Sequence, residues 1–522
     1  MKKRVFMIVM AMAMAASNLV GCSGRDAMTN TAPTVYYNET ADSVACEAPT
    51  MMDEDFNTEE YAAIDENGFK SVVTSPLSTF SADVDTASYS NLRRMILGGY
   101  TADDIPDGAV RIEEMVNYFS YDYNLPEEDE PFGVTATISD CPWNEENKLL
   151  VLGLQTEAID FSEAADSNIV FLIDVSGSMY SDNKLPLLKS SFALMLDELG
   201  EKDKVSIVTY AGSDEVILRG VPASNKKQIL DAFDSLSAGG STNGADGINT
   251  AYELAEEYFI EGGNNRVILA TDGDFNVGVT SDSALKNLIT EKKENGVFLT
   301  VLGFGMGNYK DSKMETLADA GNGNYAYIDD IREAKKVLVE ELGANMVTVA
   351  KDVKLQVEFN PAYVSEYRLV GYENRVLATE DFEDDTKDAG EIGAGHSVTV
   401  LYEIVTADEA EESDLKYQDT NISEYGAETD EWLTLSVRYK EPDEDESKLL
   451  EYPIGEANYD KTPSDDYRFA ASVAEFGMIL RGSDYVADGS YNHILEVLDD
   501  VELDDEYKEE FRELVDAVRL ND

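Results

Sequence analysis

Five oxygen-bearing side chains in three short segments are the part of this chain best suited to chemistry. They are Asp174, Ser176 and Ser178 in FLIDVSGSM, Thr242 in GGSTNG and Asp272 in LATDGDFN. Carboxylate and hydroxyl oxygens are hard donors of the kind that Mg²⁺, Mn²⁺ or Ca²⁺ prefers. Because only two of the five side chains carry charge, a bound cation would attract a further anion. The pattern therefore predicts a divalent metal site at which an acidic group of a partner can bind.

Apolar strands and amphipathic helices alternate around these residues. The strand candidates are Ile169–Ile173, Val205–Tyr210, Val267–Ala270 and Val297–Phe304, and Leu188, Phe192, Met195, Leu196 and Leu199 keep helical spacing between the first two. Such alternation predicts an α/β domain over residues 166–346, with a mainly parallel sheet covered on both faces. Ligands bind beyond the carboxyl ends of such strands, which is where Asp174 and Asp272 stand.

The regions that flank this domain have a different periodicity. Residues 350–445 alternate apolar and polar side chains and predict an antiparallel β module, and residues 460–522 carry helical stripes. An N-terminal flanking region, residues 66–160, contains a helical pattern at 112–119 and strand candidates at 133–138 and 149–154. We expect these two strands to pair with the β module, so that the α/β domain is an insertion in a β-sandwich.

The three metal-ligand segments together resemble the von Willebrand factor type A domain and its metal-ion-dependent adhesion site. The resemblance implies a doubly wound, Rossmann-like sheet. It also implies that Ser176 and Ser178 bind the cation directly, that Asp174 and Asp272 act largely through water, and that Thr242 binds in a high-affinity state. The segments PLSTFSADVDTASYSNLRRM and RIEEMVNYFSYDY, with the tail that follows the domain, resemble a group of bacterial lipoproteins built around it.

Other interpretations of the same residues fit less well. The segment DGDFNVGVTSDS imitates an EF-hand loop but has Val277 and Ser283 where glycine and glutamate are needed. The run GFGMGN lacks the third glycine of a dinucleotide fingerprint, and Ser176 stands where an aspartyl phosphatase would have a second acid. The two histidines, His396 and His493, lie in different regions, and no HExxH, GxSxG or CxxC motif occurs. We therefore expect a binding protein and not an enzyme.

The N-terminus has the pattern of an export signal. Residues 1–21 combine Lys2, Lys3 and Arg4 with a short apolar stretch, and Leu19-Val20-Gly21-Cys22 resembles the bacterial lipobox, which implies acylation of Cys22. Residues 22–65 are polar and predict a flexible acidic tether. We therefore expect a lipid-anchored protein on the extracytoplasmic face of a cell membrane. Cys46 and Cys141 are not expected to be catalytic, and their pairing stays open.

Charge excludes one class of partner. The 522 residues carry a formal net charge of −65, so nucleic acid would be repelled. The expected function is metal-dependent binding of a carboxylate on a protein partner, with Mg²⁺, Mn²⁺ or Ca²⁺ as the cation. The alternative is an assembly or chaperone-like subunit of a membrane complex in the cell envelope.

Overall fold

The computed structural model of the chain describes residues 59–521, apart from 83–84, 128–129, 160–163, 241–244, 274–281, 308, 408–421, 443 and 487–488. The predicted signal peptide, most of the predicted tether, Cys22, Cys46 and Thr242 therefore lie outside the described residues. Within the described part, no helix combines the length and the apolar character that crossing a bilayer requires.

A mainly parallel sheet forms the centre of the α/β domain, as predicted. Its strands are β5 (Ser167–Asp174), β6 (Lys204–Tyr210), β7 (Asp214–Pro222), β8 (Asn264–Thr271), β9 (Phe298–Phe304) and β10 (Tyr325–Ile328), in the order β10-β9-β8-β5-β6-β7. All neighbours are parallel except the edge strand β7, which runs antiparallel to β6. This edge strand was not predicted from the sequence.

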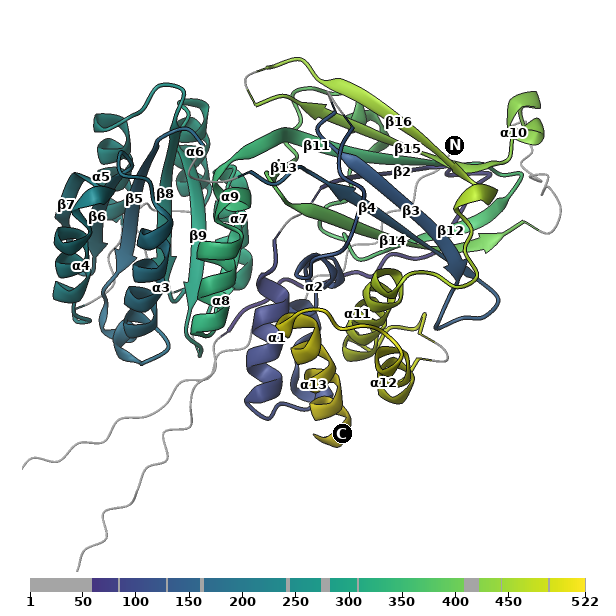
Figure 1. Cartoon of the computed structure of the whole chain (residues 1–522), viewed down its shortest axis with the longest axis horizontal. Helices are drawn as coiled ribbons and strands as arrows, with labels where there is room; N and C mark the ends of the chain where they lie inside the picture. The colour runs from purple at the N-terminus through teal and green to yellow at the C-terminus, as the bar shows by residue number, and fades with distance from the viewer. Residues whose placement is uncertain are drawn as a thin grey trace, which may run out of the picture. The chain divides into compact units, whose positions relative to one another are not determined.

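Helices cover both faces of this sheet (Figure 1). They are α3 (Leu185–Glu198), α4 (Lys226–Ser235), α5 (Ala245–Glu257), α6 (Asp282–Glu294), α7 (Asp311–Ala320) and α8 (Ile331–Lys335). Alternate side chains of the central strand β5 enter two different cores. Phe171 packs with Phe192 of α3, while Leu172 shares a core with Ile248 of α5. The sheet is therefore doubly wound, and the near-continuous apolar sequence of its strands follows from burial on both faces.

Two antiparallel sheets form a β-sandwich. One has the order β1-β12-β14-β4-β3, and the other has the order β13-β11-β15-β16, with β2 also paired to β11. Their strands are β1 (Lys70–Ser71), β2 (Leu77–Ser81), β3 (Gly133–Asp140), β4 (Lys148–Gln155), β11 (Thr348–Phe359), β12 (Val364–Val370), β13 (Gly390–Gly393), β14 (Ser397–Thr406), β15 (Glu431–Lys440) and β16 (Lys448–Gly455). Side chains of both sheets fill one apolar core.

The α/β domain interrupts this sandwich. Strand β4 precedes the domain and pairs with β14, which follows it; Leu150 lies opposite Tyr402 and Leu152 opposite Val400. This pairing confirms the predicted insertion. The N-terminal flanking region contributes more than was predicted, because β1 and β2 also join the two sheets.

A group of helices from both ends of the chain packs beside the sandwich (Figure 1). They are α1 (Ala87–Leu97), α2 (Ile112–Asn117), α11 (Asp465–Arg481), α12 (Tyr491–Asp499) and α13 (Glu506–Asn521), and they share one apolar core. Helix α2 is shorter than the predicted span, but Phe119 still reaches this core. Helix α11 begins where the side chain of Ser464 accepts a hydrogen bond from the Tyr467 N–H, and ends at the left-handed residue Gly482.

The first described residues lie against the α/β domain. Glu60 pairs with the loop after β9: its N–H donates to the Tyr309 carbonyl at 3.0 Å, and its carbonyl accepts from the Asp311 N–H at 3.2 Å. The carboxylate of Glu59 accepts hydrogen bonds from Arg94 of α1 at 3.1 and 3.0 Å. Glu59 and Glu60 therefore lie at the carboxyl-end edge of the parallel sheet.

Candidate metal centre

Two buried carboxylates stand at the carboxyl ends of adjacent parallel strands. Asp174 is the last residue of β5, and Asp272 follows β8 directly. Because β5 and β8 are neighbours in register, the two side chains emerge on the same edge of the sheet. Both residues are 0% exposed. The structure thus brings together two of the predicted metal ligands that are 98 residues apart in the sequence.

The two serines lie in the turn that follows β5. The N–H of Ser176 donates to Asp174 Oδ1 at 2.8 Å, and the hydroxyls of Ser176 and Ser178 are 2.9 Å apart. Ser176 is buried whereas Ser178 is exposed. The DxSxS spacing therefore places a buried carboxylate next to two neighbouring serines, of which Ser178 is exposed to solvent.

The loop that carries Thr242 approaches the same turn. The Gly239 N–H donates to the Val175 carbonyl at 2.8 Å, and the Gly177 N–H donates to the Gly240 carbonyl at 3.2 Å. Thr242 itself lies outside the described residues, so its role stays a prediction. The central residues of the rejected EF-hand segment also lie outside them.

Burial makes the site unfavourable for uncompensated negative charge. Desolvation raises the pKa of Asp174 to about 6, the charge of Asp272 acts in the same direction, and hydrogen bonds from Ser176 oppose the rise. A cation between the two carboxylates would relieve this cost. The donor set of carboxylate and hydroxyl oxygens fits a hard divalent cation such as Mg²⁺ or Mn²⁺.

A lysine that the sequence analysis did not single out completes the described part of the site. Lys184 Nζ lies 2.9 Å from Asp272 Oδ2, and the two side chains are 8% and 0% exposed. No sequence motif predicts that a lysine ten residues after Asp174 contacts Asp272, which follows β8. Only the folded sheet brings Lys184 and Asp272 together.

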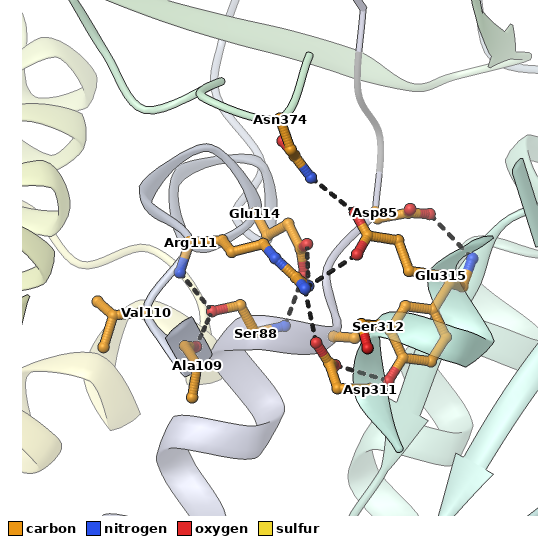
Figure 2. Close-up of polar contacts among 12 residues, drawn as sticks. Asp85, Ser88, Ala109, Val110, Arg111, Glu114, Asp311, Ser312, Glu315 and Asn374 are labelled. Carbon is orange, nitrogen blue, oxygen red and sulfur yellow. Dashed lines mark hydrogen bonds and ion pairs between the residues drawn. The ribbon is translucent and has the colours of Figure 1, made fainter. Parts of the chain in front are cut away.

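A second buried group of charges centres on Arg111 (Figure 2). Arg111 contacts Glu114 at 2.9 Å, Asp311 at 2.6 Å and Glu315 at 2.9 Å, and Asn374 donates to Glu315 at 2.7 Å. Arg111 directly precedes α2, and the other residues come from α2, from α7 and from the loop after β12. The group therefore joins the helices, the α/β domain and the sandwich, and we interpret it as a structural joint.

A third group consists of carboxylates in the sandwich. Asp352, Asp388 and Glu391 place ligand oxygens within 4.8 Å of one another. Lysines already contact two of the three, since Lys440 lies 2.7 Å from Asp352 and Lys293 lies 2.9 Å from Asp388. None of these acids belongs to the predicted site.

The histidines and the glycine run have structural surroundings. His493 lies on α12, where its Nδ1 is 2.9 Å from Glu475 Oε1, and burial lowers the pKa of His396 in the loop before β14. The GFGMGN run begins in β9, and its residues 305–307 lie in the turn after that strand, where Gly305 and Gly307 have φ values of 78° and 93°. Cys141 is buried and is not in a disulfide among the residues described.

Three family descriptions match consecutive parts of the chain. The von Willebrand factor type A domain matches residues 168–340, and a description named von Willebrand factor matches residues 55–151. The description "Uncharacterized protein YfbK, C-terminal" matches residues 344–520. Together the three matches cover both flanks and the α/β domain.

Curated relatives match this chain over very different lengths. Uncharacterized protein YfbK of Escherichia coli (strain K12) is 43% identical over 469 residues, which are 88% of this chain and 81% of that protein. Inter-alpha-trypsin inhibitor heavy chain H4 of Homo sapiens is 34% identical over 147 residues, 26% of this chain and 16% of that protein. The human voltage-dependent calcium channel subunit alpha-2/delta-2 is 25% identical over 244 residues, 44% of this chain and 20% of that protein. These names describe an uncharacterised protein, an inhibitor heavy chain and a channel subunit, and none names an enzyme.

Solved structures match at lower identity. A von Willebrand factor type A protein from Catenulispora acidiphila is 16% identical with a TM-score of 0.41, covering 74% of this chain and 90% of that one. The ArnB paralog VWA2 from Sulfolobus acidocaldarius is 15% identical with a TM-score of 0.36, covering 75% of this chain and 98% of that one.

Proposed function

We propose a function from one premise: this chain belongs to the YfbK family, which is built around a von Willebrand factor type A domain. The proposed function is to bind a protein partner through a divalent cation. The partner would supply a carboxylate to the cation. Type A domains commonly mediate protein–protein interaction through such a site. The observation that carries the proposal is the convergence of Asp174, Ser176, Ser178 and Asp272 at one edge of the sheet.

The chemistry of the donors supports an acidic partner. Ser176 and Ser178 would hold the cation through neutral oxygens, whereas Asp174 and Asp272 lie buried behind them. A cation held this way keeps much of its positive charge toward solvent and gains from a further anionic ligand. Thr242 would add a hydroxyl oxygen. Mg²⁺ is the preferred candidate, with Mn²⁺ or Ca²⁺ as alternatives.

Removal of Asp174 tests this proposal. We expect the full-length protein to capture its partner from envelope extracts in Mg²⁺ and to lose it in EDTA. Asp174→Ala should abolish capture because it removes a carboxylate of the metal site. The fold should be kept, because the substitution removes a buried charge and does not add one. Asp231→Ala is the control, since it removes a carboxylate that is 65% exposed on α4. Equal capture in Mg²⁺ and in EDTA would contradict the mechanism.

We further propose that the protein is anchored by lipid at Cys22 on the extracytoplasmic face of a cell membrane. The lipobox-like residues Leu19–Cys22 support this location. Binding without catalysis is the proposed mode of action, in line with the relatives' names. The carboxylate ligand would then belong to a protein at the cell surface or within the envelope.

A subunit role in a membrane complex is the second candidate. The partial similarity to a calcium channel subunit favours it, although that similarity covers 44% of this chain. Cross-linking on intact cells separates the two candidates. Capture of matrix or host proteins would favour adhesion, and capture of neighbouring membrane proteins would favour assembly.

A further inference from the structure

Backbone hydrogen bonds at the start of α3 fix the position of Lys184 beside the candidate metal centre. Its N–H donates to the Ser181 carbonyl at 3.0 Å, and its carbonyl accepts from the Leu188 N–H at 2.8 Å, at the start of α3. From there the side chain reaches Asp272 Oδ2 at 2.9 Å. The lysine thus connects the loop after β5, which carries the serines, to the carboxylate after β8.

The stem of Lys184 is confined by Gly305 in the loop after β9. A Cβ atom at Gly305 would lie 2.1 Å from Lys184 Cε and 2.5 Å from Cγ, so only glycine leaves room for the stem. Gly305 also has a φ of 78°, which favours glycine. The Lys184 side chain is 8% exposed, so the ammonium is placed by packing and not by chance on an open surface.

We propose that Lys184 is a built-in cation that weakens metal binding and strengthens the attraction of the loaded centre for a partner's carboxylate. This inference rests on the proposed function. Among the residues that the structure describes at this edge, Asp174 and Asp272 supply two negative charges, and Lys184 cancels one of them. A divalent cation therefore brings the sum of these described charges to a net positive value, whereas without the lysine the same sum would be zero. Positive charge in a buried site favours an incoming anion.

The two effects have opposite signs, which separates this role from a purely structural one. If Lys184 only positioned Asp272, its removal would weaken both metal binding and carboxylate binding. If it acts as a competing cation, its removal strengthens metal binding and weakens carboxylate binding. The sign of the change in metal affinity therefore decides between the two roles.

The test compares wild type, Lys184→Met, Lys184→Arg and Lys227→Met as full-length proteins in detergent at pH 7.5. Mn²⁺ alone is titrated first, with free Mn²⁺ measured by electron paramagnetic resonance. Acetate is then added to the Mn²⁺-loaded proteins, and its binding is followed by the relaxation of water protons. Lys227 is the charge-matched control, because its side chain is 87% exposed on α4.

We expect Lys184→Met to bind Mn²⁺ more tightly by about tenfold or more and acetate several times more weakly. Lys184→Arg should keep both affinities closer to wild type, and Lys227→Met should leave both unchanged. Weaker or unchanged Mn²⁺ binding in Lys184→Met would overturn the inference. Absence of Mn²⁺ binding in the wild-type protein would defeat the proposed function. If Lys184→Met bound Mn²⁺ and wild type did not, the role of the lysine would still be supported. If neither protein bound Mn²⁺, the inference would be overturned.

Discussion

Replacement of Arg111 with methionine tests whether the buried charge group in Figure 2 holds three parts of the protein together. Arg111 is 3% exposed and is the shared partner of Glu114, Asp311 and Glu315. Methionine keeps most of the length of the side chain and removes only the guanidinium. Three buried carboxylates then lose their common counter-charge.

The expected cost is large because one partner of a buried ionic group is removed. Breaking a buried pair costs about 3–5 kcal/mol, against a total stability of about 5–15 kcal/mol for a folded domain. Desolvation already raises the pKa of Glu315 well above its ordinary value, although Arg111 and Arg375 oppose the rise. Without Arg111 this carboxyl takes up a proton more readily, which places the cost toward the lower end of the range.

The pH dependence has a definite sign. A carboxyl whose pKa is higher in the folded state than in the unfolded state binds its proton first in the folded state, so its protonation stabilises the fold as pH falls. Arg111→Met removes a charge that lowers the pKa of Glu315, so this pKa rises further. Its deficit in the free energy of unfolding should therefore be smaller at pH 5.5 than at pH 8.

Urea titrations followed by circular dichroism measure this deficit. The control is Arg219→Met, because Arg219 is 55% exposed and pairs only on the surface, with Glu257 at 3.1 Å. It should cost less than about 1 kcal/mol. An Arg111→Met deficit no larger than that of Arg219→Met would refute the reasoning. A deficit that grows as pH falls would refute the assigned role of the carboxyls.

Two further changes test other parts of the chain. His493→Gln removes the contact with Glu475, whose hydrogen bond raises the pKa of His493; the stabilisation should be complete below pH ~6.5 and lost as pH rises through the raised pKa. In urea titrations, His493→Gln should therefore lower the free energy of unfolding more at pH 5.5 than at pH 9. A decrease that does not depend on pH would count against the His493–Glu475 pair. Cys22→Ser should release the protein from the membrane fraction and abolish acylation, whereas Cys141→Ser should do neither; a membrane-bound, acylated Cys22→Ser protein would remove the proposed anchor.

Local patterns were sufficient to predict most elements of the α/β domain. The apolar runs at 169–173 and 267–270 became strands β5 and β8, because strands buried on both faces need uninterrupted apolar sequence. The edge strand β7 was not predicted, because it lacks such an uninterrupted apolar run. It is partly exposed and reads as a mixed polar segment, so its pairing with β6 is decided by tertiary contact.

The candidate site was only partly predictable. Asp174 and Asp272 follow apolar runs directly, and parallel strands carry their carboxyl ends to one edge, so sequence alone could place them together. Lys184 could not be placed because its position depends on the gap that Gly305 leaves beside β9. The Arg111 group was equally hidden, since its partner Asp311 lies 200 residues away in another domain.

The position of Glu59 and Glu60 beside the metal loops has a mechanical consequence. A pull on the N-terminal side of Glu59 would first load its contacts with Arg94 and the hydrogen bonds of Glu60 to the loop between β9 and α7. That loop adjoins the residues after β8, since Gly273 lies close to Lys310. Tension between the proposed N-terminal anchor and the proposed partner at the metal would therefore follow a short path through one corner of the α/β domain. Among the helices beside the sandwich, α1 would share that force through Arg94.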